Sequence, residues 1–207
     1  MTHTLHRSGS RESLQDDYIV FAMSAKGMNE RGSAPKLQEF LKMALKYNPT
    51  NYGDMKTGNS LVKSDAQLMD GVQDVSIVHA VFHDTDTVAA LLNDLARADL
   101  GVSVVVSGLT DEAAQCCHHA HLEPHTVEYS LGIWGKTELL PEPAIRDVTT
   151  MCGHGQVSAG LVQRLVKQIK RGKLTCEQAA DLLAKPCVCG VFNRKRAAAL
   201  LQRMVES

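Results

Sequence analysis

The stretch Val75-Ser-Ile-Val-His-Ala-Val-Phe82 decides the fold class, because it is an apolar run of strand length that a helix pattern follows directly. Asp84 or Thr85 can cap that helix, which ends at Gly101. Its apolar face recurs at Val88, Leu91, Leu92 and Leu95. The run Val102-Ser-Val-Val-Val106 then has the composition of a second strand. A strand, a helix and a strand in this order predict a layered domain of sheet and helices.

The segments on both sides continue this alternation. Upstream, we expect a strand at 18–23, a helix that Ser33 caps and that Asn48-Pro49 ends, and a weaker strand near 60–63. Downstream, we expect a helix over 111–120 and a strand over 126–130. The fold class is therefore α+β or α/β. A ferredoxin-like β-α-β-β-α-β order with one extra α-β unit is favoured, and a flavodoxin-like parallel sheet is the competing arrangement.

Beyond Trp134 the sequence predicts helices only. Ser158 can cap a helix that ends at Gly172, Thr175 and Gln178 can form a capping box, and Asn193 can cap the last helix. The proline-containing segment 139–150 reads as a linker. We thus expect four parts: a flexible tail (1–16), a sheet-and-helix domain (17–138), the linker (139–150) and a small all-helical metal-binding module (151–207).

Composition and charge restrict the class of protein. No apolar run approaches the roughly 20 residues that span a bilayer, and the polar N-terminus lacks the apolar core of a secretory signal. We therefore expect a cytoplasmic protein without a membrane segment. In a reducing compartment, its six clustered cysteines indicate metal binding or redox chemistry rather than disulfides. Residues 158–207 hold ten of the 22 Lys and Arg residues but only three of the 23 acidic ones, so this part is basic.

Two short turns carry the candidate metal ligands. Met151-Cys-Gly-His-Gly155 and Pro186-Cys-Val-Cys-Gly190 each offer two ligands one residue apart, beside glycines that let the backbone curl around one point. The two helices between the turns should form an antiparallel hairpin, whose ends lie close together. We therefore expect Cys152, His154, Cys187 and Cys189 to form a metal site, because four ligands from two loops hold both zinc and iron–sulfur centres.

The same stretch resembles a known module. Cys152-x-His154-x-x-Val157-Ser158, an apolar helix ending at Ile169-x-x-Gly172, Leu174-Thr175-x-Glu177 and Cys187-x-Cys189-Gly190 are similar to the [2Fe–2S] domain of bacterioferritin-associated ferredoxins. That domain has a C-x-C pair, a helix beginning near Val-Thr/Ser, a G-x-x-T-x-E turn and a C-x-x-C pair. The resemblance covers residues 151–193 and implies a [2Fe–2S] cofactor. The first domain resembles no family that we recognise.

Two departures from the family pattern keep alternatives open. His154 replaces the second cysteine, and the final C-x-x-C is shortened to C-x-C. Imidazole can ligate a [2Fe–2S] iron, but three cysteines and a histidine are also a common structural zinc set. We favour an iron–sulfur protein in electron transfer or redox sensing. The alternatives are a structural zinc module in a regulatory or binding protein, and a metalloenzyme with an open coordination position.

Other signals are weaker. One predicted helix carries Cys116, Cys117, His118 and His119. Adjacent residues on a helix point about 100° apart, so an amphipathic helix with Cys inward and His outward is favoured over a second metal site.

The glycine-containing loops 24–33 and 53–59 have no assigned role. The basic residues of 164–173 and Arg194-Lys195-Arg196 suggest docking of an acidic redox partner, with nucleic-acid binding less favoured. The oligomeric state is not predicted.

Overall fold

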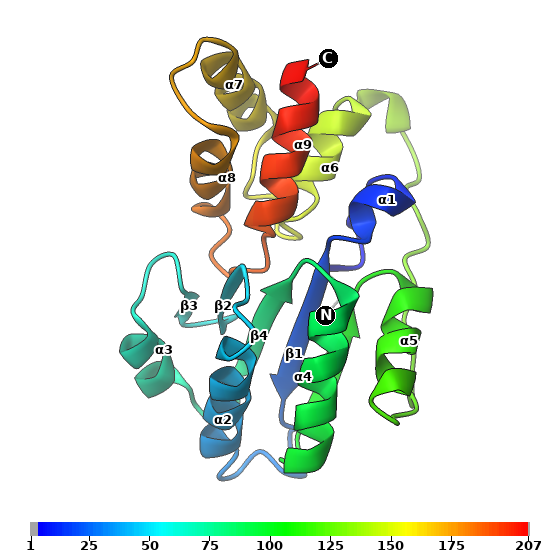
Figure 1. The fold of residues 1–207 in the computed structure, drawn as a ribbon, viewed down its shortest axis with the longest axis vertical. Helices are drawn as coiled ribbons and strands as arrows, with labels where there is room; N and C mark the ends of the chain where they lie inside the picture. The colour runs from blue at the N-terminus through cyan, green and yellow to red at the C-terminus, as the bar shows by residue number, and fades with distance from the viewer. Residues whose placement is uncertain (1–3, 207) are drawn as a thin grey trace.

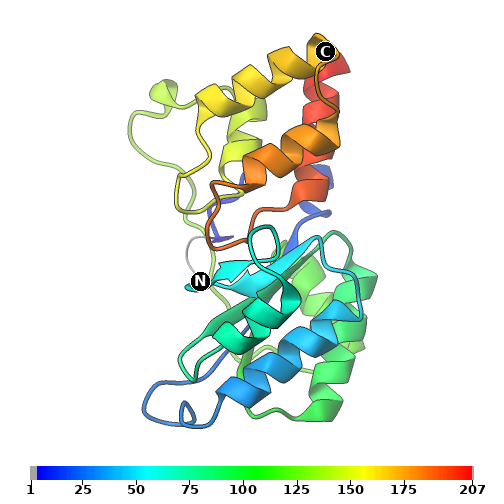
Figure 2. The same ribbon diagram turned by 90° about the vertical axis from the view of Figure 1, so that its left-hand side faces the viewer.

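A five-stranded sheet forms the middle layer of the molecule, as the computed structural model of the chain shows for residues 4–206. Figure 2 shows helices α2 and α4 on one side of the sheet and the C-terminal helices on the other. The strands are β1 (Tyr18–Met23), β2 (Asn51–Asp54), β3 (Gly58–Asn59), β4 (Ile77–Phe82) and β5 (Ser103–Ser107). They lie in the order β3-β2-β4-β1-β5, and each neighbouring pair is antiparallel. The competing prediction of a flavodoxin-like parallel sheet is therefore wrong.

The helices fall into two groups by their place in the chain, and in Figure 1 α1 of the first group lies beside α6 of the second. The first group belongs to the part of the chain that forms the sheet: α1 (Arg11–Leu14), α2 (Ala34–Leu45), α3 (Asp65–Gly71), α4 (Thr85–Ala98) and α5 (Thr110–His119). The second group forms the C-terminal module: α6 (Pro143–Thr149), α7 (Ala159–Lys170), α8 (Cys176–Ala184) and α9 (Arg194–Glu206). A short 3-10 turn, η2 (Thr137–Leu139), precedes α6. In the described part of the chain, none of these helices has the length and apolar character to cross a bilayer.

Both faces of the sheet are buried, because side chains alternate between two cores along each strand. On β1, Tyr18, Val20 and Ala22 pack with α2 and α4. Ile19 and Phe21 point the other way and share a core with the C-terminal module. The module is therefore packed directly on the sheet. The two turns that carry the candidate ligands lie between the sheet and the helices of the module.

Two predicted strands differ from the structure. The weak strand expected near 60–63 is replaced by the hairpin of β2 and β3. This hairpin contains Gly, Asn and Asp, which have low strand propensity, so the sequence did not indicate strands there. Pairing of β2 with β4 holds it in the sheet. The strand expected at 126–130 does not form. These residues are exposed, and the chain leaves the sheet edge at β5 and runs to α6 (Figure 1).

Two predicted irregular segments are also more ordered than expected. Within the expected linker, residues 143–149 form α6, which buries Ile145 and Val148 in the module core. Within the expected flexible tail, residues 11–14 form α1, and the Thr4 side chain is buried. Residues 1–3 of that tail lie outside the described residues. Polar composition suggested a loose tail, but the segment is held by contacts with distant residues.

Those contacts centre on the carboxylate of Asp17, at the start of β1. Arg196 Nη1 donates to Asp17 at 2.7 Å, and Arg7 and the Asn193 amide also donate to this carboxylate. The side chains of Arg196 and Asp17 are 1% and 0% exposed. Arg196 further donates to the Ser13 hydroxyl and the Ser8 carbonyl. The network thus joins the N-terminal segment, the sheet and α9.

We predict that Arg196→Met lowers the free energy of unfolding by about 3 kcal/mol, because it leaves a buried carboxylate without its main partner. Arg203→Met is the matched control on the same helix. Arg203 pairs with Glu12 at the surface, where the side chains are 51% and 80% exposed, so its loss should cost less than about 1 kcal/mol. Denaturant titration of both variants measures the difference. Equal costs would contradict the role given to Arg196.

Candidate metal centre

Local capping places the two ligand turns at the same end of a helical hairpin. Ser158 caps α7 by accepting the Leu161 N–H, and the expected capping box of Thr175 and Gln178 opens α8. The chain between α7 and α8 is a short turn around Gly172. The start of α7 and the end of α8 therefore lie close together. The turn before α7 carries Cys152 and His154, and the turn after α8 carries Cys187 and Cys189.

The structure brings the four predicted ligands together in a row from Cys152 to His154, in which two contacts are direct. Cys152 is buried in the same core as Cys187, and the pKa values of these two thiols depend on each other. Cys187 Sγ lies 3.8 Å from Cys189 Sγ, and Cys189 Sγ lies 3.6 Å from His154 Nδ1. The three cysteines are 0% to 2% exposed, whereas His154 is exposed. The row thus runs from a buried sulfur to an imidazole at the surface.

The electrostatic environment favours thiolates at both ends of the sulfur row. The pKa of Cys152 lies well below its usual value, because the Cys187 thiol and the backbone N–H groups of Gln156, His154 and Val157 donate to its sulfur. The pKa of Cys189 is lowered in the same way, by the Cys187 thiol and by the Val191 N–H. The pKa of Cys187 is raised, because its proton is held between the other two sulfurs. Thiolates are the forms that bind metals.

The measured contacts can be compared with those of a metal site. Two thiolates about 2.3 Å from one tetrahedral zinc ion lie about 3.8 Å apart, and a thiolate and an imidazole nitrogen lie about 3.6 Å apart. The two measured distances match these values. In the part of the chain that the structure describes, however, no group of three or more Cys, His, Asp or Glu side chains is arranged so that it could hold an ion as it stands. The Cys187–Cys189 and Cys189–His154 pairs have distances that fit a metal, and the set is a row rather than a closed cage.

The sheet holds the second ligand turn from below through two asparagines. The Asn51 amide donates to the Gly190 carbonyl at 2.8 Å, and the Asn59 amide donates to the Val188 carbonyl at 3.0 Å. Both asparagines are buried. Gly190 has φ +80°, and a Cβ there would lie 2.4 Å from Asn59 Cβ. Sequence reasoning missed both asparagines, because their role depends on the hairpin of β2 and β3 packing beneath a turn from a distant part of the chain.

Two further side chains connect the first ligand turn with the second. Gln156 accepts the Val188 N–H at 3.3 Å. Arg7 donates to the Met151 carbonyl at 3.4 Å and to the Val191 carbonyl, while its guanidinium also pairs with Asp17. Met151 is the first residue of the first turn, and Val191 follows the second. Arg7, in the segment expected to be flexible, therefore fastens both turns to the sheet.

The other candidate residues lie elsewhere. Cys116 is buried in the core on the opposite face of the sheet, and His118 and His119 are exposed. The expectation of an amphipathic helix with Cys116 inward is confirmed.

In loop 24–33, the Asp74 carboxylate accepts the N–H groups of Gly32 and Ala34, so the N-terminus of α2 already has its anionic partner. Loop 53–59 is the hairpin beneath the second ligand turn.

Comparison with models of protein families, with curated proteins and with solved structures finds no match for this chain.

We predict that Gly190→Ala costs the metal-free, reduced protein about 2 to 4 kcal/mol of unfolding free energy, because the methyl group meets Asn59 and the backbone is left-handed there. Gly155→Ala is the matched control in the other turn. Gly155 has φ +67°, but a Cβ there meets nothing within 4 Å, so only the backbone cost of about 1 kcal/mol applies. Denaturant titration in the presence of a chelator compares them. A Gly190→Ala cost no larger than that of Gly155→Ala would show that the hairpin does not hold the turn.

Proposed function

We propose that Cys152, His154, Cys187 and Cys189 bind a [2Fe–2S] cluster and that the protein acts in electron transfer or redox sensing. The observation that carries this proposal is that four side chains from two turns more than thirty residues apart gather in one place. Cys187 contacts Cys189, Cys189 contacts His154, and Cys152 is buried in the same core. The similarity of residues 151–193 to the bacterioferritin-associated ferredoxins supports the choice of cluster.

The surroundings of the row suit such a centre. A [2Fe–2S] cluster, when bound, supplies one-electron transfer at a potential that hydrogen bonds to the sulfurs and solvent exposure tune. Backbone N–H groups in and directly after the first turn lower the pKa of Cys152 and would stabilise its negative charge. The buried positions of the cysteines exclude water from the sulfurs. His154 alone of the four is exposed, so the imidazole is the ligand through which solvent or a partner would reach the centre.

Structural zinc is the second candidate, and one observation favours it. The two measured contacts have the lengths expected when both atoms bind one tetrahedral ion. A zinc site would also need Cys152 to approach the other ligands, so that the row closes into a cage. In that case the module would support a binding or regulatory protein without redox chemistry.

We also propose that residues 17–107 form a ferredoxin-like unit to which the β2–β3 hairpin adds a fifth strand. The support is the order β2-β4-β1-β5 with α2 and α4 on one face of an antiparallel sheet. In this arrangement the uncovered face of the sheet is the one available to receive the module.

Anaerobic purification followed by an absorption spectrum and iron and acid-labile sulfide analysis tests the cluster. We expect visible charge-transfer bands with iron and sulfide in equal amounts. Cys152→Ser, Cys187→Ser and Cys189→Ser should each lose most of the iron, because each removes a thiolate ligand. Cys176→Ser is the matched control in the same module, because the Cys176 thiol donates to Gln202 instead. This variant should keep its iron.

Zinc bound without sulfide or visible bands would favour the structural zinc alternative. Iron content that falls equally in Cys176→Ser and Cys187→Ser would contradict the assignment of the ligands. His154→Cys separates the two metals further. A structural zinc site should tolerate this change, whereas an iron–sulfur centre should keep its iron but show a shifted reduction potential.

A further inference from the structure

The outer face of α7 carries a cluster of unpaired positive charge. Five basic residues lie on or just beyond this helix: Arg164, Lys167, Lys170, Arg171 and Lys173. All five are exposed, and within residues 4–206 no carboxylate forms an ion pair with any of them. The chain has no Asp or Glu between Asp147 and Glu177. The positive charge of this face is therefore not neutralised locally.

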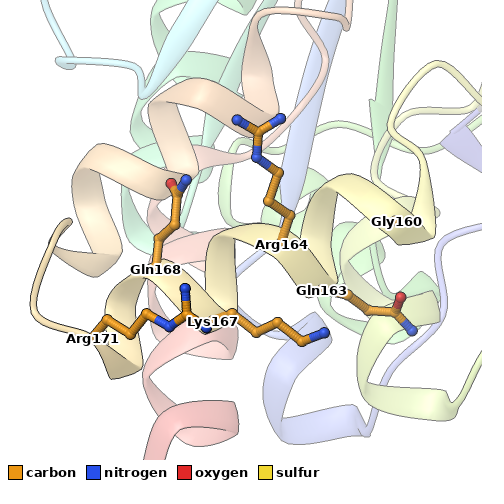
Figure 3. A pocket seen from close by; sticks show the side chains of 6 residues that line it. All are labelled: Gly160, Gln163, Arg164, Lys167, Gln168 and Arg171. Atoms are coloured by element: carbon orange, nitrogen blue, oxygen red, sulfur yellow. The ribbon is translucent and has the colours of Figure 1, made fainter.

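A shallow groove runs along this face (Figure 3). It is lined by residues at helical spacing: Gly160, Gln163, Arg164, Lys167, Gln168 and Arg171. Figure 3 shows Arg164 and Gln168 projecting to one side of α7, and Gln163 and Lys167 to the other. The opposite side of the helix buries Val162 and Leu165 in the module core. The helix is thus fixed on the module, and its cationic side faces outward.

The basic run at 194–196, by contrast, is already engaged. Arg194 pairs with Asp181 and donates to the Thr50 carbonyl, and Arg196 is buried against Asp17. Lys195 Nζ lies 3.2 Å from the His83 ring. The excess positive charge available to a partner is therefore concentrated on α7.

The position of α7 connects this charge with the candidate metal centre. The helix begins at Ala159, directly after the turn that carries Cys152 and His154. Arg164 lies about 8 Å along the helix axis from its start, at about 1.5 Å per residue. The only exposed ligand of the four, His154, belongs to the turn at that end of the helix. A protein seated on the first turns of α7 would lie beside the exposed end of the row of ligands.

We propose that the cationic face of α7 is the docking surface for an acidic redox protein that exchanges electrons with the centre through its His154 side. This inference rests on the proposed function. An acidic surface complements the five unpaired charges, and such complementarity raises association rates and orients the partner. The polar groove, with two glutamines between the basic side chains, suits a transient and hydrated contact.

Nucleic acid is the less favoured occupant of this face. Proteins that bind single strands stack bases on aromatic side chains, and no Phe, Tyr or Trp occurs between Trp134 and the buried Phe192. The run at 194–196, which would extend a phosphate-binding surface, is engaged within the protein.

Charge reversal on α7 tests the proposal, with an acidic flavodoxin as the probe. Arg164→Glu with Lys167→Glu is the test variant. Lys36→Glu with Lys46→Glu is the matched control, because both lysines are exposed, Lys36 on α2 and Lys46 directly after it, on the other side of the sheet, and the net charge changes equally. Anaerobic stopped-flow spectroscopy follows reduction of the cluster by reduced flavodoxin. We expect the rate to fall with salt, and to fall at least about tenfold in the test variant at low ionic strength.

A second measurement does not depend on the cluster. In a titration of the metal-free chain with oxidised flavodoxin, NMR chemical shifts of α7 should change, and these changes should disappear only in the test variant. If the chain binds no cluster but this titration gives the expected result, the proposed function fails while the docking surface stands. A salt-independent rate, no shift changes on α7, an equal effect in the control, or tighter binding of a short DNA duplex to α7 would each overturn the inference.

Discussion

The buried carboxylate of Asp17 is the contact on which the arrangement of the molecule depends. It receives Arg196 and Asn193 from the start of α9 and Arg7 from the N-terminal segment. Arg7 in turn donates to the backbone on the outer side of each ligand turn. A buried negative charge requires such partners, because leaving it without them costs several kcal/mol. The hydrogen bonds and ion pairs to the Asp17 carboxylate therefore fix the module on the sheet and hold the two turns together.

The geometry of the candidate centre follows from this attachment. The helical hairpin of α7 and α8 brings the two turns to one end of the module, and Asn51 and Asn59 hold the second turn from the sheet. The sulfurs are consequently buried between two layers, whereas the imidazole of His154 stays at the surface. A cluster in this position would be insulated on one side and accessible on the other. The unpaired charge on α7 lies next to the accessible side.

Local signals in the sequence were sufficient for helices α7, α8 and α9 and for the meeting of the ligand turns, but not for α6. Ser158, Thr175 and Asn193 cap helices as their sequence context indicates. The sheet was harder to predict. Strands buried on both faces are mostly apolar, so Val78 to Phe82 gives no sign of its direction. The β2–β3 hairpin contains residues that disfavour strands. The roles of Arg7, Asn51 and Asn59 depend on contacts between distant parts of the chain, which one sequence does not reveal.

Pulsed EPR of the dithionite-reduced protein tests the central claim most directly, because it reports both the nature of the centre and its histidine ligand. We predict the signal of a reduced [2Fe–2S] cluster with hyperfine coupling to one imidazole nitrogen, and loss of that coupling in His154→Cys with the cluster signal retained. Absence of a paramagnetic cluster after reduction, or nitrogen coupling that persists in His154→Cys, would contradict the account.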